Sequence, residues 1–295
     1  MPKTAFLFPG QASQFVGMGT ELIVSYPKAT ELFATADQIL GFDLSKVMFN
    51  GSEEELKQTN ITQPSVFLHS IISYQCKLVD QTPDAVAGHS LGEFSALVCA
   101  GVMSFEDGLR LVRQRALAMQ EACDQNPGTM AAIVGLEEAQ IEDICCNITD
   151  DVCVAANYNC PGQLVISGSI EGIKKAESLL IAAGAKRVIL LNVGGAFHSP
   201  LMQPAKEKLA DAINNTNFSK PICPVYQNVN SLPQTDPQQI QENLIQQLTA
   251  PVLWTQTIQA MIKNGIEEFV EVGGNGTVLS GFMKRIDRNS IIRTA

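Results

Sequence analysis

Residues 87–94 read Ala87-Gly88-His89-Ser90-Leu91-Gly92-Glu93-Phe94, and an apolar run continues from Ser95 to Ala100. The residues before the turn are typical of a strand, and the run after it is typical of a helix. The turn has the form G-x-S-x-G, which holds a serine on strained backbone between small neighbours. The stretch therefore predicts a strand–turn–helix unit of an α/β fold, with Ser90 as a candidate nucleophile. An ordinary glycine-rich turn is the alternative unless a catalytic base can be found.

Bulk composition is that of an ordinary globular protein. The chain has 295 residues, 45% of them hydrophobic and 17% charged, so it can bury a substantial core. Thirty acidic residues against 20 basic ones give a net charge of −10, which argues against nucleic acid or an anionic membrane as the main partner. No apolar stretch is long enough to span a membrane, and Thr4–Phe8 is too short for a signal peptide.

The cysteines predict neither a metal site nor a disulfide framework. There are eight, with no C-x-x-C spacing, and most lie in apolar periodic stretches where cysteine behaves as a small hydrophobe. We therefore expect reduced thiols, no bound metal and a cytoplasmic protein.

Strands and helices alternate over the first and last parts of the chain. Strands are predicted at residues 4–8, 85–88, 225–229 and 267–272, and helices at 27–40, 63–78, 201–214, 237–248 and 252–264, with a last helix after Gly273-Gly274-Asn275-Gly276. This alternation favours a parallel sheet covered by helices. We therefore assign residues 1–126 and 195–295 to one discontinuous large domain.

The middle of the chain follows a different order. After Asp124-Gln125-Asn126-Pro127-Gly128, strands are predicted at 129–134, 152–156, 163–167 and 186–192, with helices at 137–146 and 170–183. The order βαββαβ is that of the ferredoxin-like unit. Residues 127–194 are therefore predicted to form a small domain inserted into the large one.

A serine nucleophile needs a neighbouring proton acceptor, and the chain has three histidines. His69 lies in the middle of an apolar helix, where a structural histidine is the usual explanation. His89 precedes Ser90, and consecutive residues at the end of an extended segment point to opposite sides. His198 lies in a glycine-rich loop just after a strand, where catalytic residues concentrate. By elimination His198 is the candidate base, although spacing reveals no acidic residue to orient it.

The oxyanion hole of such a turn uses the backbone N–H of the residue after the serine, which here is Leu91. A second N–H comes from another loop at the same edge of the sheet. The loop Pro9–Gln14 follows the first strand, and Gln11 is the leading candidate within it.

Arg115 lies on the apolar face of a helix that is predicted to begin after Ser104. That face is defined by Phe105, Leu109, Val112, Ala116 and Met119. A buried guanidinium keeps its charge and needs an anionic partner. The projection favours a structural salt bridge to an acidic residue, and the alternative is an arginine that binds the carboxylate of a substrate.

Four motifs occur together in a fixed order: Phe8-Pro9-Gly10-Gln11, then Gly88-His89-Ser90-Leu91-Gly92-Glu93, then Arg115 before Met119-Gln120-Glu121, and Gly195-Ala196-Phe197-His198-Ser199. In these motifs, over essentially its whole length, the chain resembles the malonyl-CoA:acyl-carrier-protein transacylases. The resemblance implies an α/β-hydrolase-like large domain with a ferredoxin-like insertion, as the strand order independently predicts.

The resemblance also implies roles for individual residues. Ser90 would be the acylated nucleophile, His198 the general base and acid, and the N–H groups of Gln11 and Leu91 the oxyanion hole. Arg115 would hold the free carboxylate of the malonyl group in a bidentate pair. A backbone carbonyl at Gln247 would orient the histidine in place of an acidic residue.

Two further positions match family positions that face the substrate. Asn157 corresponds to a residue that lines the cleft between the domains, and Phe197 would crowd an α-methyl group on the acyl chain. Two departures stand beside these matches: Ala12 replaces a glycine of the oxyanion loop, and the late turn is Gly273-Gly274-Asn275-Gly276 instead of one with Gly-Pro-Gly. If position 12 requires a positive φ, alanine there costs about 1 kcal/mol.

The expected function is transfer of malonyl from malonyl-CoA to the phosphopantetheine thiol of an acyl carrier protein in fatty-acid biosynthesis. A discrete malonyl acyltransferase of polyketide synthesis, a serine thioesterase or hydrolase, and a non-catalytic carrier-binding protein are the alternatives. We expect no cofactor and a monomer. Carrier proteins are acidic, so candidate docking residues are the basic ones Lys174, Lys175, Lys186, Arg187, Lys284, Arg285 and Arg288, each of which could equally be a solvated surface charge.

Overall fold

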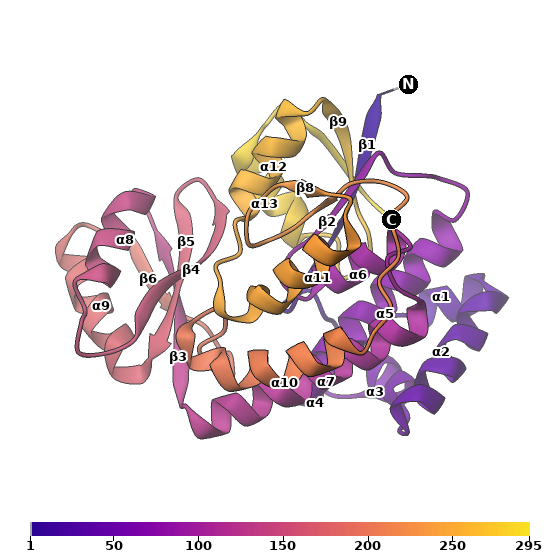
Figure 1. The fold of residues 1–295 in the computed structure, drawn as a ribbon, viewed down its shortest axis with the longest axis horizontal. Coiled ribbons are helices and arrows are strands. Elements are labelled where there is room, and N and C mark those ends of the chain that lie inside the picture. Colours follow the sequence, from indigo (N-terminus) through magenta and orange to yellow (C-terminus); the bar gives the residue numbers. More distant parts are fainter. Residues whose placement is uncertain (1) are drawn as a thin grey trace.

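A computed structural model describes residues 2–295, and two separate β-sheets organise it (Figure 1). The larger sheet has six strands in the order β10-β9-β1-β2-β7-β8. The strands are β1 (Lys3–Phe8), β2 (Ala85–Gly88), β7 (Val225–Tyr226), β8 (Pro233–Gln234), β9 (Ile266–Glu271) and β10 (Ile291–Thr294). All neighbours are parallel except β7 and β8. The parallel sheet predicted from the alternating elements is confirmed.

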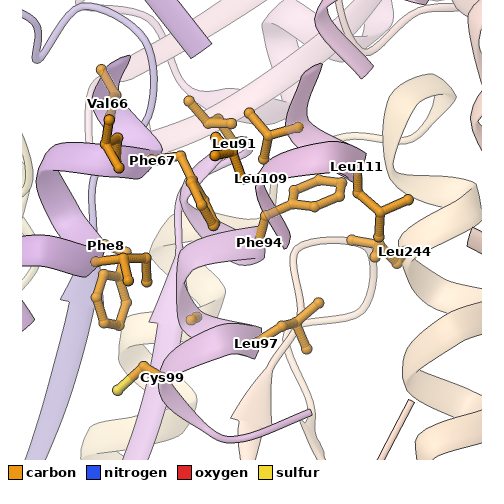
Figure 2. Close-up of a cluster of buried hydrophobic side chains, with 14 of the residues drawn as sticks. Phe8, Val66, Phe67, Leu91, Phe94, Leu97, Cys99, Leu109, Leu111 and Leu244 are labelled. Carbon is orange, nitrogen blue, oxygen red and sulfur yellow. The ribbon is translucent and has the colours of Figure 1, made fainter. Parts of the chain in front are cut away.

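Helices cover both faces of this sheet. Successive residues of β1 point to opposite faces and are all apolar from Ala5 to Phe8, so both faces have to be buried. Phe6 and Phe8 pack toward α5 (Thr59–Lys77), α6 (Gly92–Cys99) and α7 (Phe105–Gln125). Ala5 and Leu7 pack toward α12 (Trp254–Lys263) and α13 (Val278–Ile286) on the opposite face. Figure 2 shows the first of these cores, with Phe94 of α6 among side chains of α5, α7 and β1.

The other helices of the large part lie on the side of α5 and α7. They are α1 (Thr20–Ser25), α2 (Pro27–Leu40), α3 (Leu44–Asn50), α4 (Glu53–Lys57), α10 (Gln203–Asn214) and α11 (Pro237–Gln246), with 3₁₀ turns at Pro200–Met202 and Gln247–Thr249. The predicted cap of α7 is present, since the Ser104 side chain accepts a hydrogen bond from the Asp107 backbone N–H at 3.0 Å. Within residues 2–295 no helix has the length and apolar character needed to cross a membrane.

The smaller sheet forms a lobe at the left of Figure 1. It contains β3 (Gly128–Val134), β4 (Cys153–Cys160), β5 (Gln163–Ser169) and β6 (Arg187–Leu190), with α8 (Glu138–Cys146) and α9 (Ile170–Ala182) packed on it. The order β4-β5-β3-β6 with antiparallel pairing is that of the ferredoxin-like unit, as the sequence order predicted. The lobe has its own apolar core, which includes Ile133, Ile141, Ile166 and Ile173. The residue boundaries assigned to the two domains stay predictions.

The edge of β4 joins the lobe to the large part. Val252, just before α12, donates its N–H to the Ala156 carbonyl at 2.8 Å and accepts from the Tyr158 N–H at 2.9 Å. The Thr255 hydroxyl donates to the Tyr158 carbonyl at 3.0 Å. These backbone bonds fix Asn157, which lies between them, at the junction of the two parts.

Several expected element boundaries were wrong. Neither β8 nor β10 was predicted; β8 has only two residues, and β10 is an edge strand with an exposed Ile291, so neither carries a strong apolar pattern. The strand expected at residues 152–156 runs on to Cys160, because Tyr158 and Cys160 pair with β5, and only Pro161 and Gly162 remain in the turn. The helix expected at 201–214 begins as a 3₁₀ turn, and α12 begins at Trp254.

Candidate active site

Two glycines allow the turn around Ser90 to form. A Cβ on Gly88 would lie 1.9 Å from the backbone of Gly92, and one on Gly92 would lie 2.0 Å from the Phe8 carbonyl oxygen. No side chain fits at either position, so β2, α6 and β1 can approach this closely only with glycine there. Ser90 itself has φ 51°, in the left-handed region that costs a serine free energy. This strained strand-to-helix turn is a nucleophile elbow.

The structure brings the predicted base to the predicted nucleophile. His198 Nε2 lies 2.8 Å from Ser90 Oγ, across 108 residues of sequence. The other ring nitrogen, Nδ1, lies 2.9 Å from the Gln247 carbonyl oxygen and 3.2 Å from that of Ala250. These carbonyls can only accept, so Nδ1 carries the proton and Nε2 faces the serine with its lone pair. A backbone carbonyl thus orients the histidine, and the Gln247 side chain donates to the Ser90 carbonyl at 3.0 Å.

Electrostatics keep His198 neutral. Burial, together with the positive charge of Arg115, lowers the pKa of His198 to about 3. The imidazole is therefore unprotonated at neutral pH and able to take the proton of Ser90. Like Ser90, His198 has a positive φ, 57°, so strained backbone occurs at both members of the pair.

Arg115 lies directly behind the nucleophile. Its guanidinium is fully buried, and Nη2 donates to Ser90 Oγ at 3.0 Å and to Gln247 Oε1 at 3.3 Å. Nη1 donates to Gln63 Oε1 at 2.7 Å. Burial lowers the pKa of Arg115 to about 9, so it stays charged at neutral pH. Across residues 2–295 no carboxylate oxygen lies within 4.0 Å of this guanidinium, so the structural salt bridge that the helix projection favoured is not formed.

The two predicted oxyanion donors lie beside the elbow. Gln11 lines the cavity at Ser90, and Leu91 follows the nucleophile at the start of α6. Within the described part of the chain, neither backbone N–H donates to a protein acceptor. Ala12 has φ 77°. The position at which alanine replaces the family's glycine therefore does have a positive φ. The roles of Gln11 and Leu91 as oxyanion donors stay predictions.

A cavity of about 240 Å³ opens onto Ser90 and His198 between the two parts of the chain. Asn157 of β4 and Phe197 both line it, and each is 6% exposed; that they contact substrate stays a prediction. Lys57 is the one formally charged side chain among the described residues that line the cavity. Arg115 does not line the cavity itself, but it donates to Ser90 Oγ, which does, so a negatively charged acyl group carried on Ser90 would lie next to this guanidinium.

Several polar residues near the elbow were not found from the sequence. The Gln63 side chain bridges Arg115 and Gln11, to whose Oε1 it donates at 3.3 Å. His89 bonds Asn159 of β4 at 2.8 Å, so it links the turn to the small lobe. A lone glutamine in a helix and an asparagine in a strand carry no periodic signal that could have revealed these contacts.

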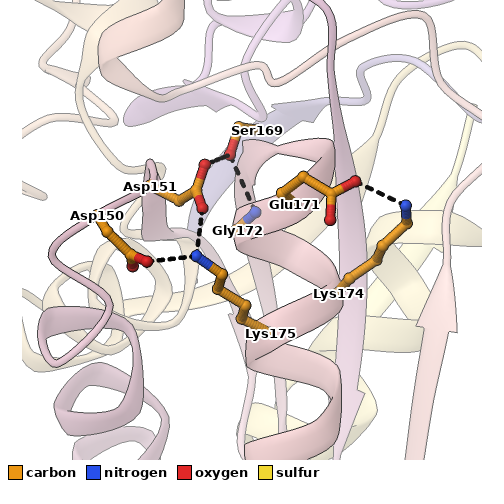
Figure 3. Close-up of polar contacts among 7 residues, drawn as sticks. All are labelled: Asp150, Asp151, Ser169, Glu171, Gly172, Lys174 and Lys175. Atoms are coloured by element: carbon orange, nitrogen blue, oxygen red, sulfur yellow. Dashed lines mark hydrogen bonds and ion pairs between the residues drawn. The ribbon is translucent and has the colours of Figure 1, made fainter.

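Side chains outside the active site decide whether a metal ion could be bound and where an acidic carrier protein could dock. Within residues 2–295 no cluster of three or more histidine, cysteine, aspartate or glutamate side chains could hold a metal ion. Figure 3 shows Lys175 paired with Asp150 and Asp151, and Lys174 paired with Glu171. These two candidate docking lysines therefore already have anionic partners on their own lobe.

Comparison with known proteins agrees with this geometry. Residues 5–291 match the model of the acyl transferase domain family. The malonyl CoA-acyl carrier protein transacylase of Bacillus subtilis is 44% identical over 98% of this chain and 92% of its own length, and that of Escherichia coli K12 is 43% identical over 97% and 93%.

Solved structures show the same fold. The malonyl CoA-acyl carrier protein transacylase of Coxiella burnetii superposes with a TM-score of 0.96 at 40% identity, covering 100% of this chain and 94% of that one. A malonyl-transacylase in complex with a type II PKS acyl-carrier protein gives a TM-score of 0.95 at 38% identity, over 99% and 96%. With a nucleophile elbow, a neutral histidine and a buried arginine in place, this chain belongs to the acyl transferase family and, within it, to the malonyl CoA-acyl carrier protein transacylases.

Proposed function

We propose that this protein transfers a malonyl group from malonyl-CoA to the phosphopantetheine thiol of an acyl carrier protein, in fatty-acid biosynthesis. The observation that carries the proposal is the buried Arg115, which has no carboxylate partner among residues 2–295 and donates to Ser90 Oγ at 3.0 Å. A buried cation without an anion is costly, and a carboxylate supplied by the substrate removes that cost. The bidentate geometry of guanidinium suits the free carboxylate of malonyl.

In the first half-reaction Ser90 attacks the thioester carbonyl carbon of malonyl-CoA. His198 Nε2 takes the Ser90 proton, and the N–H groups of Gln11 and Leu91 stabilise the negative oxygen of the tetrahedral intermediate. The carbon–sulfur bond then breaks, and the CoA thiolate takes the proton back from His198. The product is a malonyl ester on Ser90.

The second half-reaction runs the same chemistry with another thiol. The phosphopantetheine thiol of the carrier gives its proton to His198 and attacks the malonyl-serine carbonyl. The bond to Ser90 Oγ breaks, and Ser90 recovers a proton from His198. Both halves balance without a metal or an organic cofactor, and the scheme predicts ping-pong kinetics.

Arg115 changes partners during this cycle. In the free enzyme its Nη2 donates to Ser90 Oγ, which favours the ionised character that the oxygen acquires during attack. Once the oxygen is acylated, the same donor is released to the malonyl carboxylate. Gln63 holds Nη1 throughout, because its Oε1 accepts from that nitrogen at 2.7 Å.

For the carrier we propose a docking surface at the C-terminal end of α13. Val278 and Phe282 of α13 line the cavity, and Lys284 and Arg288 follow on the exposed side of the same segment. In contrast to Lys174 and Lys175, neither has a salt-bridge partner among the described residues. An acidic carrier held there lies next to the entrance through which its thiol must pass.

Two alternatives differ in the acceptor. A thioesterase would pass the acyl group to water, and a polyketide-synthesis transferase would use another carrier protein. One experiment separates them: the malonylated enzyme is mixed with buffer, with a fatty-acid carrier or with a polyketide carrier. Rapid discharge only with the fatty-acid carrier supports the proposal, whereas equally rapid discharge in buffer alone shows a hydrolase.

The same proposal includes a cytoplasmic monomer. All eight cysteines are free thiols, seven of them at least partly buried, and free thiols persist in a reducing compartment. Sedimentation of the purified protein measures its mass in solution. The mass of one chain is expected, and the mass of a dimer would contradict the proposal.

A further inference from the structure

The backbone of the elbow is held by a side chain from the turn that follows the neighbouring strand β7. Asn228 Oδ1 accepts the Ser90 N–H at 2.7 Å, and Asn228 Nδ2 donates to the Gly88 carbonyl at 2.7 Å. One amide thus spans the backbone groups on either side of His89. Asn228 and Gly88 are buried, so the bond to the Gly88 carbonyl forms away from water, whereas Ser90 is partly exposed to the cavity.

The position of Asn228 follows from the sheet. β7 pairs with β2 in parallel register, with Ala87 opposite Tyr226, and β7 ends there. Asn228 follows two residues later, level with the turn that leaves β2. Its amide presents one N–H and its oxygen to the elbow, as a peptide group would, so it continues the hydrogen-bond ladder where the backbone of β7 has turned away.

Glu93 fixes Asn228 in turn. The Glu93 carboxylate accepts from the Asn228 backbone N–H at 2.8 Å and from Gln227 Nε2 at 3.1 Å. Glu93 lies on the first turn of α6, three residues after Ser90, and its own N–H donates to the Ser90 carbonyl at 3.1 Å. The contacts form a closed ring from Ser90 through Glu93 and Asn228 back to Ser90, in which all three side chains have polar partners.

Strain explains why such a ring is required. Ser90 has φ 51°, and a residue there costs of order 1–3 kcal/mol unless its surroundings hold it. Asn228 is fully buried outside the cavity lining, and both ends of its amide are bonded to backbone of the elbow, so it acts on that backbone. We infer that Asn228, locked by Glu93, is a positioning residue that keeps Ser90 Oγ aligned with His198 and with the incoming thioester carbonyl.

A second consequence concerns the oxyanion hole. The Ser90 N–H is occupied by Asn228, so it cannot serve the oxyanion. Loss of the Asn228 amide would free this N–H and the Gly88 carbonyl, and the two peptide groups on either side of His89 could then rotate. Rotation would move Ser90 Oγ and the Leu91 N–H together, although no group that binds substrate had been removed.

The test compares Asn228→Ala and Asn228→Asp with the unmutated enzyme and with Asn243→Ala. Asn243 is the control, because it is a buried asparagine that has no contact with the elbow and reaches the ring only indirectly, through Gln227 and Glu93. The inference rests on the proposed function, so the first readout is the rate constant for malonylation of Ser90 by malonyl-CoA, followed by rapid quench and mass spectrometry. If the unmutated enzyme is not malonylated, the proposed function is wrong. The comparison of rate constants among the variants separately tests the positioning role of Asn228.

Asn228→Ala is expected to lower the acylation rate constant about 100-fold, since small misplacements of reacting atoms cost that much. The malonyl-CoA concentration for half-maximal rate should stay within about threefold of the unmutated value. Asn243→Ala should change the rate constant less than about threefold. Equal rate losses in Asn228→Ala and Asn243→Ala would overturn the inference, as would a loss that appears only in substrate binding.

Asn228→Asp supplies a second readout, the pH dependence of its acylation rate, which can be measured even if the variant is less stable. A protonated carboxyl reproduces the donor and acceptor of the amide, whereas an ionised one has no donor for the Gly88 carbonyl. The pKa values of His198 and Arg115, about 3 and about 9, lie outside the range from pH 6 to pH 8, but that of Glu93 is about 7 in the unmutated enzyme, so the acylation rate of the variant is divided by that of the unmutated enzyme at each pH. The ratio should rise at least about fivefold from pH 8 to pH 6. A ratio that does not change with pH contradicts the inference.

Discussion

Arg115 Nη2 lies 3.0 Å from Ser90 Oγ, so a fully buried guanidinium touches the nucleophile itself. The same charge also lowers the pKa of His198, which faces Ser90 from the other side. One side chain therefore acts on the nucleophile and on its base, and under the proposed function it would also bind the carboxylate of the acyl group.

Arg115→Ala should lower malonyl transfer by at least about 100-fold, because the malonyl carboxylate loses its charged partner. Acetyl transfer, which needs no such partner, should be retained or gained. The measurement is kcat/KM for malonyl-CoA and for acetyl-CoA. Arg113→Ala is the control, since Arg113 lies on the same helix with its guanidinium over the Phe42 ring, away from Ser90. Equal losses for both acyl groups would mean that Arg115 is structural.

The pH dependence of acylation should lack an inflection at the ordinary histidine pKa. Burial and Arg115 hold the pKa of His198 at about 3, so the base is already deprotonated throughout the neutral range. His198 should therefore contribute no change to the malonylation rate constant from pH 8 down to about 5, and comparison with Glu93→Gln removes any change due to Glu93. Rapid-quench measurements over this range decide the matter, and an acid limb centred near pH 6.5 would show an unperturbed histidine.

Ala12→Gly should stabilise the protein. Ala12 has φ 77°, where alanine costs about 1 kcal/mol that glycine does not, although part of the gain is lost to the greater freedom of glycine in the unfolded chain. The free energy of unfolding in urea should rise by about 0.5 kcal/mol. Ala34→Gly, at an exposed position inside α2, should instead lower it by about 1 kcal/mol. A loss of stability in both variants would contradict the strain at position 12.

The stability contributed by Glu93 should depend on pH. Burial raises the pKa of Glu93 from 4.5 to about 7, against the opposing hydrogen bonds from Asn228 and Gln227. The folded state then binds the proton more tightly than the unfolded one, so the contribution is full below pH 4.5 and is lost as pH rises through 7. Relative to Glu93→Gln, the unmutated protein should lose on the order of 1–3 kcal/mol between pH 5 and 8. Parallel unfolding free energies for the two proteins over that range would exclude a raised pKa.

Carrier docking should depend on α13 and not on α9. Lys284→Ala/Arg288→Ala removes two charges beside the cavity, and Lys174→Ala/Lys175→Ala removes two that are already paired with acidic residues. The first double variant should raise the KM for the carrier about fivefold or more, most strongly at low salt, with malonylation by malonyl-CoA unchanged. A larger effect from the second pair would place the carrier on the small lobe.

The sequence predicted those parts of the site that local patterns encode. Gly88 and Gly92 bracket Ser90 within five residues, and helical projection placed Arg115 on a buried face. The partner of Arg115 was not predictable in the same way. Its contacts with Gln63 and Gln247 span 52 and 132 residues, and amide side chains carry no charge or periodicity that would reveal them.

The fold shows the same division. The βαββαβ order of the small lobe follows from well-marked turns, and it was predicted strand by strand. The edge strands β8 and β10 were missed, because a strand with a single neighbour needs little apolar character. Asn228 was missed for a related reason: its importance depends on the register of β7 against β2, which no local pattern records.

The most direct test of the account is the intact mass of the protein after brief mixing with malonyl-CoA. The unmutated enzyme should gain one malonyl group, mapped by peptide analysis to Ser90, and a carrier protein should remove it. Ser90→Ala, otherwise folded, should gain none, and His198→Ala should gain it far more slowly. A malonyl adduct that persists in Ser90→Ala, or no adduct on the unmutated enzyme, would contradict the central claim that Ser90 accepts the malonyl group.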